Sequence, residues 1–108
     1  MIKKLVTITA LAMLLGSPAS YATFKSGNDL AKDCWSDSGF SKGICAGYVI
    51  GLTDILSGEG RICAPSAVTD GQVVRIVEKY LKEHPGVLHY AADSLVLIAL
   101  KNAFPCSD

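Results

Sequence analysis

The chain has 108 residues, half of them hydrophobic, with ten basic and ten acidic side chains and a formal net charge of zero. This length is enough for one domain. The charge balance argues against a nucleic-acid partner, which would require a basic patch or stripe.

The first 22 residues are typical of a signal peptide. Two lysines precede an apolar run at 5–15, and a helix-breaking Gly-Ser-Pro follows. Ser20 and Ala22 then supply small residues at the two positions that a signal peptidase recognises. The apolar run is eleven residues long, which falls short of the roughly 20 apolar residues that span a bilayer. We therefore expect cleavage after Ala22 and a periplasmic mature domain, residues 23–108, with no membrane partner. Its eight basic and ten acidic residues give a net charge of about −2.

Two helices are expected in the first half of the mature chain. The first covers about 28–35 and is entered through Ser26, whose hydroxyl is able to accept a free backbone N–H. A turn-rich segment at 36–39 ends it. Apolar residues at three- and four-residue steps predict the second helix over about 42–56, with Ser41 as its N-cap.

The second helix carries three glycines at four-residue intervals, Gly43, Gly47 and Gly51. Each interior glycine costs up to about 1 kcal/mol relative to alanine, so a compensating contact is expected. The simpler explanation is close approach of another helix within the monomer. The alternative is a partner subunit or a ligand on the glycine face.

The second half predicts an exposed loop and two further helices. The loop covers 57–68, is rich in helix breakers and is pinned at Cys63. Thr69 and Gln72 form a capping-box pattern that starts the third helix, which a Pro-Gly pair ends. A wide apolar face predicts the last helix over about 87–104. The predicted fold is therefore all-α: a small four-helix domain.

All four cysteines lie in the mature part, at Cys34, Cys45, Cys63 and Cys106. An even number in a short exported domain indicates two disulfides. Three pairings are possible, and the sequence alone does not choose among them. We favour Cys34 with Cys45, which joins the end of one helix to the start of the next, and Cys63 with Cys106, which ties the C-terminus to the middle of the chain.

No pattern of residues indicates catalysis or a cofactor. A cysteine nucleophile would need a free thiol beside a base such as His84 or His89, whereas the thiols are expected to be paired. Gaps of 11, 18 and 43 positions between the cysteines do not suit a zinc site. Asp54 is more readily explained as a surface or structural carboxylate than as a general base. We therefore expect no enzyme activity, no metal and no cofactor.

The spacing of the unusual residues resembles that of a known family. The motifs are Gly27-Asn28-Asp29-Leu30 with Cys34, Cys45-Ala46-Gly47-Tyr48-Val49-Ile50-Gly51 with Asp54, Cys63-Ala64-Pro65, Val68-Thr69-Asp70-Gly71-Gln72, Tyr80-Leu81 with Pro85, and His89, Ala92, Leu95-Val96, Ala99-Leu100 and Ala103-Phe104-Pro105-Cys106. Together they resemble the Rap/Tai family of type VI secretion amidase immunity proteins. The resemblance implies a small helical periplasmic protein, often homodimeric, that binds and blocks a peptidoglycan-cleaving amidase effector.

The motif residues look structural, so partner specificity is expected in exposed positions outside the motif. On grounds of exposure we predict two partner-binding groups: Ser57, Gly58, Glu59, Gly60 and Arg61 in the loop, and Arg75, Glu78 and Lys79 on the outer face of the third helix. The glycine face and the breadth of the last helix also predict a homodimer. The alternatives are an orphan periplasmic binding or stress protein on the same scaffold and, less favoured, a small hydrolase or redox enzyme.

Overall fold

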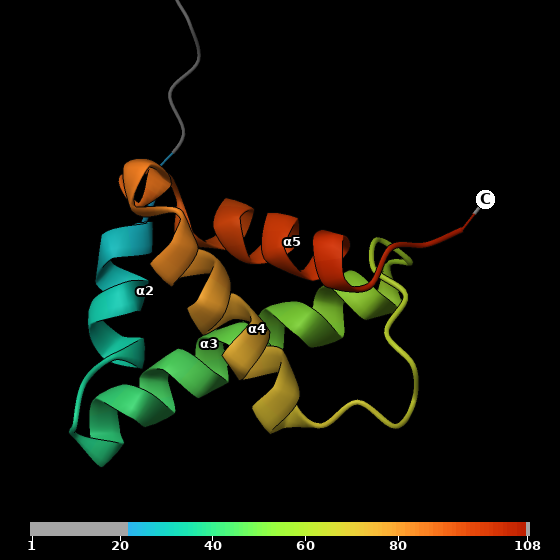
Figure 1. Ribbon diagram of the computed structural model, residues 1–108, viewed down its shortest axis with the longest axis horizontal. Coiled ribbons are helices and arrows are strands. Elements are labelled where there is room, and N and C mark those ends of the chain that lie inside the picture. Colours follow the sequence, from blue (N-terminus) through green and yellow to red (C-terminus); the bar gives the residue numbers. More distant parts are fainter. Residues whose placement is uncertain (1–21, 108) are drawn as a thin grey trace, which may run out of the picture.

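The computed structural model describes residues 22–107, so all but the last residue of the predicted signal peptide lies outside the described range. The described residues form four α-helices, α2 (Gly27–Cys34), α3 (Gly39–Gly58), α4 (Asp70–Glu83) and α5 (Ala92–Ala103), with a short 3₁₀ turn, η1 (Pro85–Val87), before α5. Figure 1 shows how α2 to α5 are arranged. α3 is the longest helix and contacts each of the other three. The all-α expectation is confirmed.

Two helices begin with reciprocal caps; the one at Thr69 and Gln72 is predicted by the sequence, and at α2 the sequence predicts only the acceptor role of Ser26. At α2, Ser26 Oγ accepts a hydrogen bond from the Asp29 N–H at 3.1 Å, and the Asp29 carboxylate accepts one from the Ser26 N–H at 3.1 Å. At α4, the Gln72 N–H donates to Thr69 Oγ1 at 3.2 Å and the Thr69 N–H donates to Gln72 Oε1 at 2.8 Å. Each pair satisfies N–H groups that have no partner within the helix.

α3 begins three residues earlier than the periodicity indicates. Its N-cap is Ser38, not Ser41: Ser38 Oγ accepts a hydrogen bond from the Ser41 N–H at 3.4 Å. Ser36 Oγ in turn accepts from the Ser38 N–H at 3.0 Å, which orders the turn after α2. Both serines are good caps, and the turn geometry selects the earlier one.

α3 also ends later than expected, so the predicted loop at 57–68 is too long at its start. Ser57 and Gly58 belong to the last turn of the helix. Gly60 has a φ of +70°, and the N–H groups of Gly60 and Arg61 donate to the carbonyls of Ser57 and Leu56 at 3.0 and 2.9 Å. This is a Schellman ending, in which a glycine in the left-handed region terminates a helix. Gly58 and Gly60, predicted from the sequence as helix breakers in a loop, therefore form the C-terminal end of α3.

The last helix is shorter than predicted, because the segment before α5 pairs with the N-terminal part of the chain. The Gly27 N–H donates to the Tyr90 carbonyl at 2.8 Å, and the Asn28 N–H donates to the Leu88 carbonyl at 2.7 Å. These carbonyls are therefore engaged outside a helix. The predicted start near 87 is wrong for this reason, and α5 begins at Ala92.

The core lies where the four helices meet. Its fully buried side chains come from every helix and from the turn after α3, and the largest are Leu30, Val49, Ile62, Val77, Leu81, Val96 and Leu100. Both favoured disulfides are confirmed: Cys34–Cys45 and Cys63–Cys106, each with a Cα–Cα distance of 5.0 Å. The first is buried between α2 and α3, whereas both cysteines of the second are exposed.

The glycine face of α3 points away from the core. A Cβ built at Gly43, Gly47 or Gly51 meets no atom within 4 Å. The expectation that another helix of the same monomer covers these glycines is therefore wrong. The glycine that does permit a close approach is Gly27, where a Cβ would lie 2.8 Å from the Leu88 carbonyl oxygen.

Candidate functional site

A surface hollow of about 410 Å³ lies between the end of α2 and the outer face of α4. The residues that line it are Trp35, Arg75, Glu78, Lys79, Lys82 and Glu83. Three of them, Arg75, Glu78 and Lys79, are residues predicted from the sequence to bind a partner. The structure therefore brings this predicted group together around one concave surface.

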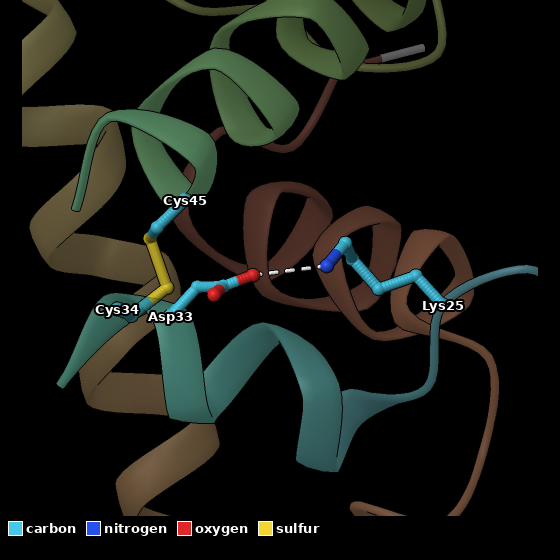
Figure 2. The surroundings of a disulfide bond; sticks show 4 residues. All are labelled: Lys25, Asp33, Cys34 and Cys45. Atoms are coloured by element: carbon cyan, nitrogen blue, oxygen red, sulfur yellow. Dashed lines mark hydrogen bonds and ion pairs between the residues drawn. A yellow bond between two sulfur atoms is a disulfide. The ribbon is translucent and has the colours of Figure 1, made fainter. Parts of the chain in front are cut away.

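Three residues that line this hollow are missing from the predicted partner-binding group: Lys82, Glu83 and, above all, Trp35. Trp35 caps α2, where its N–H donates to the Ala31 carbonyl at 2.9 Å, and it is 45% exposed. The residue before it is held by the Cys34–Cys45 disulfide (Figure 2). A usable signal was present, since Trp35 is the only tryptophan in the chain and exposed tryptophan is enriched at interfaces.

A salt bridge ties the start of the described chain to the same end of α2. Figure 2 shows Lys25 extending toward Asp33, one residue before Cys34, with an Nζ–Oδ2 distance of 2.9 Å. Both side chains are partly buried. The disulfide and this ion pair together restrict the last turn of α2, and so they restrict the position of Trp35.

A second hollow of about 380 Å³ lies beside the first. Arg75 and Glu78 line both, so these two side chains form the boundary between them. The second hollow extends over α3 to Lys42, Ala46 and Ile50. The combined surface mixes an aromatic ring, aliphatic side chains and charges of both signs, a composition that suits a protein partner better than a nucleic acid or a single small anion.

The other predicted group forms a separate surface at the C-terminal end of α3. All five residues of Ser57–Arg61 are exposed. Directly after them Ile62 is buried, and the Cys63 N–H donates to the Phe104 carbonyl at 2.9 Å. The segment is therefore a projecting turn on a fixed base. It lies outside the two hollows that hold the α4 group.

The residues considered for catalysis have structural surroundings. All four cysteines are paired, so none offers a thiolate. His84 Nδ1 lies 2.7 Å from the Tyr80 carbonyl at the end of α4, and its ring stacks on that of Tyr80 with centroids 4.1 Å apart. The His89 ring lies against Tyr90, and Asp54 is exposed on α3.

Two ionisable groups have shifted pKa values, each for a structural reason. The hydrogen bonds from Ser26, first from its backbone and then from its hydroxyl, hold the pKa of Asp29 below its ordinary value. Burial raises the pKa of Tyr48, helped by the negative charge of Asp93. Both shifts keep the group in its ordinary charge state at neutral pH, so neither prepares an acid or a base for catalysis.

Within residues 22–107, no three or more His, Cys, Asp or Glu side chains are grouped so that they would hold a metal ion. Over the same range, no helix has the length and hydropathy needed to cross a membrane.

Comparison with known families matches residues 26–106 to the Rap1a immunity proteins. The chain belongs to this family. The resemblance inferred from the spaced cysteines, glycines and caps is thereby confirmed. No curated protein gives a significant match to the chain.

The match covers all four helices that the structure describes between residues 22 and 107 of this Rap1a immunity protein. It begins at Ser26, the N-cap of α2, and ends at Cys106, the last disulfide cysteine. Both candidate surfaces lie within it. Family membership therefore supports an immunity role for the domain that carries them.

Proposed function

We propose that the mature domain is a periplasmic immunity protein that binds a peptidoglycan amidase effector of a type VI secretion system and blocks its active-site cleft. The observation that carries the proposal is the family match over residues 26–106. Two disulfides in a small domain suit an oxidising compartment. In this proposal residues 1–22 are the signal peptide and the mature chain begins at Thr23.

Inhibition would come from surface complementarity and needs no chemistry from the immunity protein. We assign the main contact to the hollow formed by Trp35, Arg75, Glu78 and Lys79, because tryptophan and arginine dominate the binding energy of many protein interfaces. We assign a second contact to Ser57–Arg61, which projects from a fixed base and suits insertion into a cleft. The protein would act as a homodimer.

The test uses purified mature protein and the amidase-like toxin encoded beside its gene. We expect a stable complex and loss of peptide-bond cleavage in purified peptidoglycan. Trp35→Ala and Arg75→Ala should weaken inhibition, whereas Lys101→Ala, on the exposed side of α5, should leave it unchanged. A toxin that stays fully active in the presence of excess protein would refute the proposal and favour an orphan periplasmic scaffold.

Localisation and processing are tested separately. Expression of the full chain in the native bacterium should yield a periplasmic protein whose N-terminal sequence begins at Thr23. Recovery of the intact chain from the cytoplasm would contradict this part of the proposal without bearing on toxin binding.

A further inference from the structure

The two disulfides of this protein differ in their access to solvent. Cys34 and Cys45 are 5% and 1% exposed and belong to the core, although Cys34 borders the second hollow. Cys63 and Cys106 are both exposed, and neither belongs to that core. A reagent in solution therefore reaches the second bond in the folded protein, whereas the first is shielded where it joins α2 to α3 (Figure 2).

Each disulfide secures a different candidate surface. Cys34–Cys45 holds the end of α2, next to Trp35 and the hollow that Trp35 lines. Cys63–Cys106 fastens the segment after α5 to the base of the projecting turn at Ser57–Arg61, near the C-terminal end of α3 (Figure 1). Opening one bond therefore acts on one surface and leaves the other in place.

The contacts around Cys63–Cys106 lie between the turn and the segment after α5. Cys106 Sγ is 3.6 Å from the Gly60 carbonyl oxygen, and the Cys63 N–H donates to the Phe104 carbonyl at 2.9 Å. Ile62, one residue before Cys63, is 2% exposed and packs in the core independently of the bond. Reduction is therefore expected to release the C-terminal segment and loosen the turn without unpacking the helices.

We propose that Cys63–Cys106 is a site of reversible thiol–disulfide exchange in the folded protein, at which a low-molecular-weight thiol such as glutathione releases the turn at 57–61. Exposed disulfides are, as a class, the labile and regulatory ones, whereas structural disulfides resist reduction. Cys34–Cys45 is shielded in the core, so the domain keeps one cross-link while the other opens and closes.

The exchange converts two small thiols into one disulfide and the protein disulfide into two thiols. A thiolate attacks Cys106 Sγ, so that a new sulfur–sulfur bond forms while the Sγ–Sγ bond breaks and its electron pair leaves on Cys63 Sγ. A second thiolate attacks the sulfur of the bound small thiol and releases Cys106 as a thiolate, and both cysteines then take protons from water. We assign Cys63 as the leaving group because Arg61, two residues before it, carries a positive charge that favours a thiolate.

The first experiment is a time course of the native protein in excess reduced glutathione, trapped by alkylation and mapped by mass spectrometry. A species with thiols at Cys63 and Cys106 and an intact Cys34–Cys45 bond should accumulate, while circular dichroism retains the helical signal. The buried bond should react at least about a hundredfold more slowly, because its reduction waits for an opening of the structure. Simultaneous appearance of four thiols, or resistance of both bonds until denaturant is added, would overturn the proposal.

A double variant, Cys63→Ser with Cys106→Ser, tests the assignment to this bond. It should fold and show no thiol over the period in which the unsubstituted protein gains two. A variant that does not fold would contradict the proposal, because the domain must stay folded with this bond open. In the unsubstituted protein the first mixed disulfide should lie on Cys106, and an adduct on Cys63 would overturn the direction of attack.

Hydrogen exchange then measures what reduction releases. The Cys63 amide, which donates to the Phe104 carbonyl, should exchange about tenfold faster or more in the two-thiol protein than in the oxidised protein. The Trp35 amide, which donates to the Ala31 carbonyl at 2.9 Å, is the matched control and should be unchanged. Equal acceleration at both amides, or none at Cys63, would refute the release of the turn.

The exchange site does not depend on the toxin, so its failure and the failure of the proposed function are distinguishable. A two-thiol species that forms in a protein with no effect on any toxin would refute only the immunity role. Inhibition of a toxin by a protein whose exposed bond resists glutathione would refute only the exchange site.

Discussion

Two glycine-to-alanine substitutions in this protein are expected to change stability in opposite directions. At Gly27 a Cβ would lie 2.5 Å from Leu95 Cδ1 and 2.8 Å from the Leu88 carbonyl oxygen. The Leu88 oxygen belongs to the backbone, and it accepts a hydrogen bond from the Asn28 N–H at 2.7 Å. Relief of the clash must therefore move the segment before α5 away from α2.

Overpacking of this kind costs about 1–3 kcal/mol, and strain in the hydrogen bond at Asn28 acts in the same direction. For Gly27→Ala we expect a loss of about 2 kcal/mol, which in a domain of this size lowers the melting temperature by roughly 8–16 °C. For Gly47→Ala, where nothing lies within 4 Å, we expect a gain of up to about 1 kcal/mol from helix propensity.

The assay is thermal unfolding followed by circular dichroism, at protein concentrations low enough to keep the chain monomeric. Denaturant unfolding of the same samples provides the free energies. The reasoning would be refuted if Gly27→Ala melted at or above the temperature of the unsubstituted protein, or if Gly47→Ala were as destabilising as Gly27→Ala.

Three further outcomes are expected. The pKa of Asp29 is lowered in the folded protein, so its stabilising contribution is present above pH 3.8, the unfolded value, and is lost as the pH falls through the lower folded value. Asp29→Asn should therefore flatten the acid limb of a curve of unfolding free energy against pH. An unchanged acid limb would contradict this assignment. Replacing Cys63 and Cys106 together by serine opens a loop of 43 residues and should remove about 4 kcal/mol in denaturant unfolding; a loss below 1 kcal/mol would show that the loop is ordered without the bond. On the proposed function, Trp35→Ala should weaken toxin binding about 30-fold or more in calorimetry, equivalent to about 2 kcal/mol, with Lys101→Ala unchanged.

The sequence predicts the features of this fold that depend on neighbouring residues. The capping box at Thr69 and Gln72 is read correctly because both partners lie within one turn of the chain. Helix order favours the Cys34–Cys45 pairing among the three possible ones, since Cys34 ends one helix and Cys45 lies near the start of the next. Such features require no knowledge of how distant helices pack.

The misread features depend on distant contacts or on backbone geometry. The start of α5 is set by hydrogen bonds between the chain near Leu88 and the chain near Asn28, about 60 positions apart. In the sequence, Gly60 is equally consistent with a residue of the loop and with the last residue of a helix ending. Only its positive φ distinguishes the two. Trp35 meets the α4 residues only through the packing of α2 beside α4, which periodicity does not encode.

The projecting turn at Ser57–Arg61 has a consequence for how such a protein acquires new partners. Its base is held by groups outside the turn itself: Ile62 in the core and Cys63 in a disulfide. Of its five exposed positions, only Gly60 is constrained by a positive φ. The other four are free to change with little effect on folding, so the scaffold tolerates rapid divergence there, and a lineage of such proteins is able to follow a changing toxin by a few substitutions.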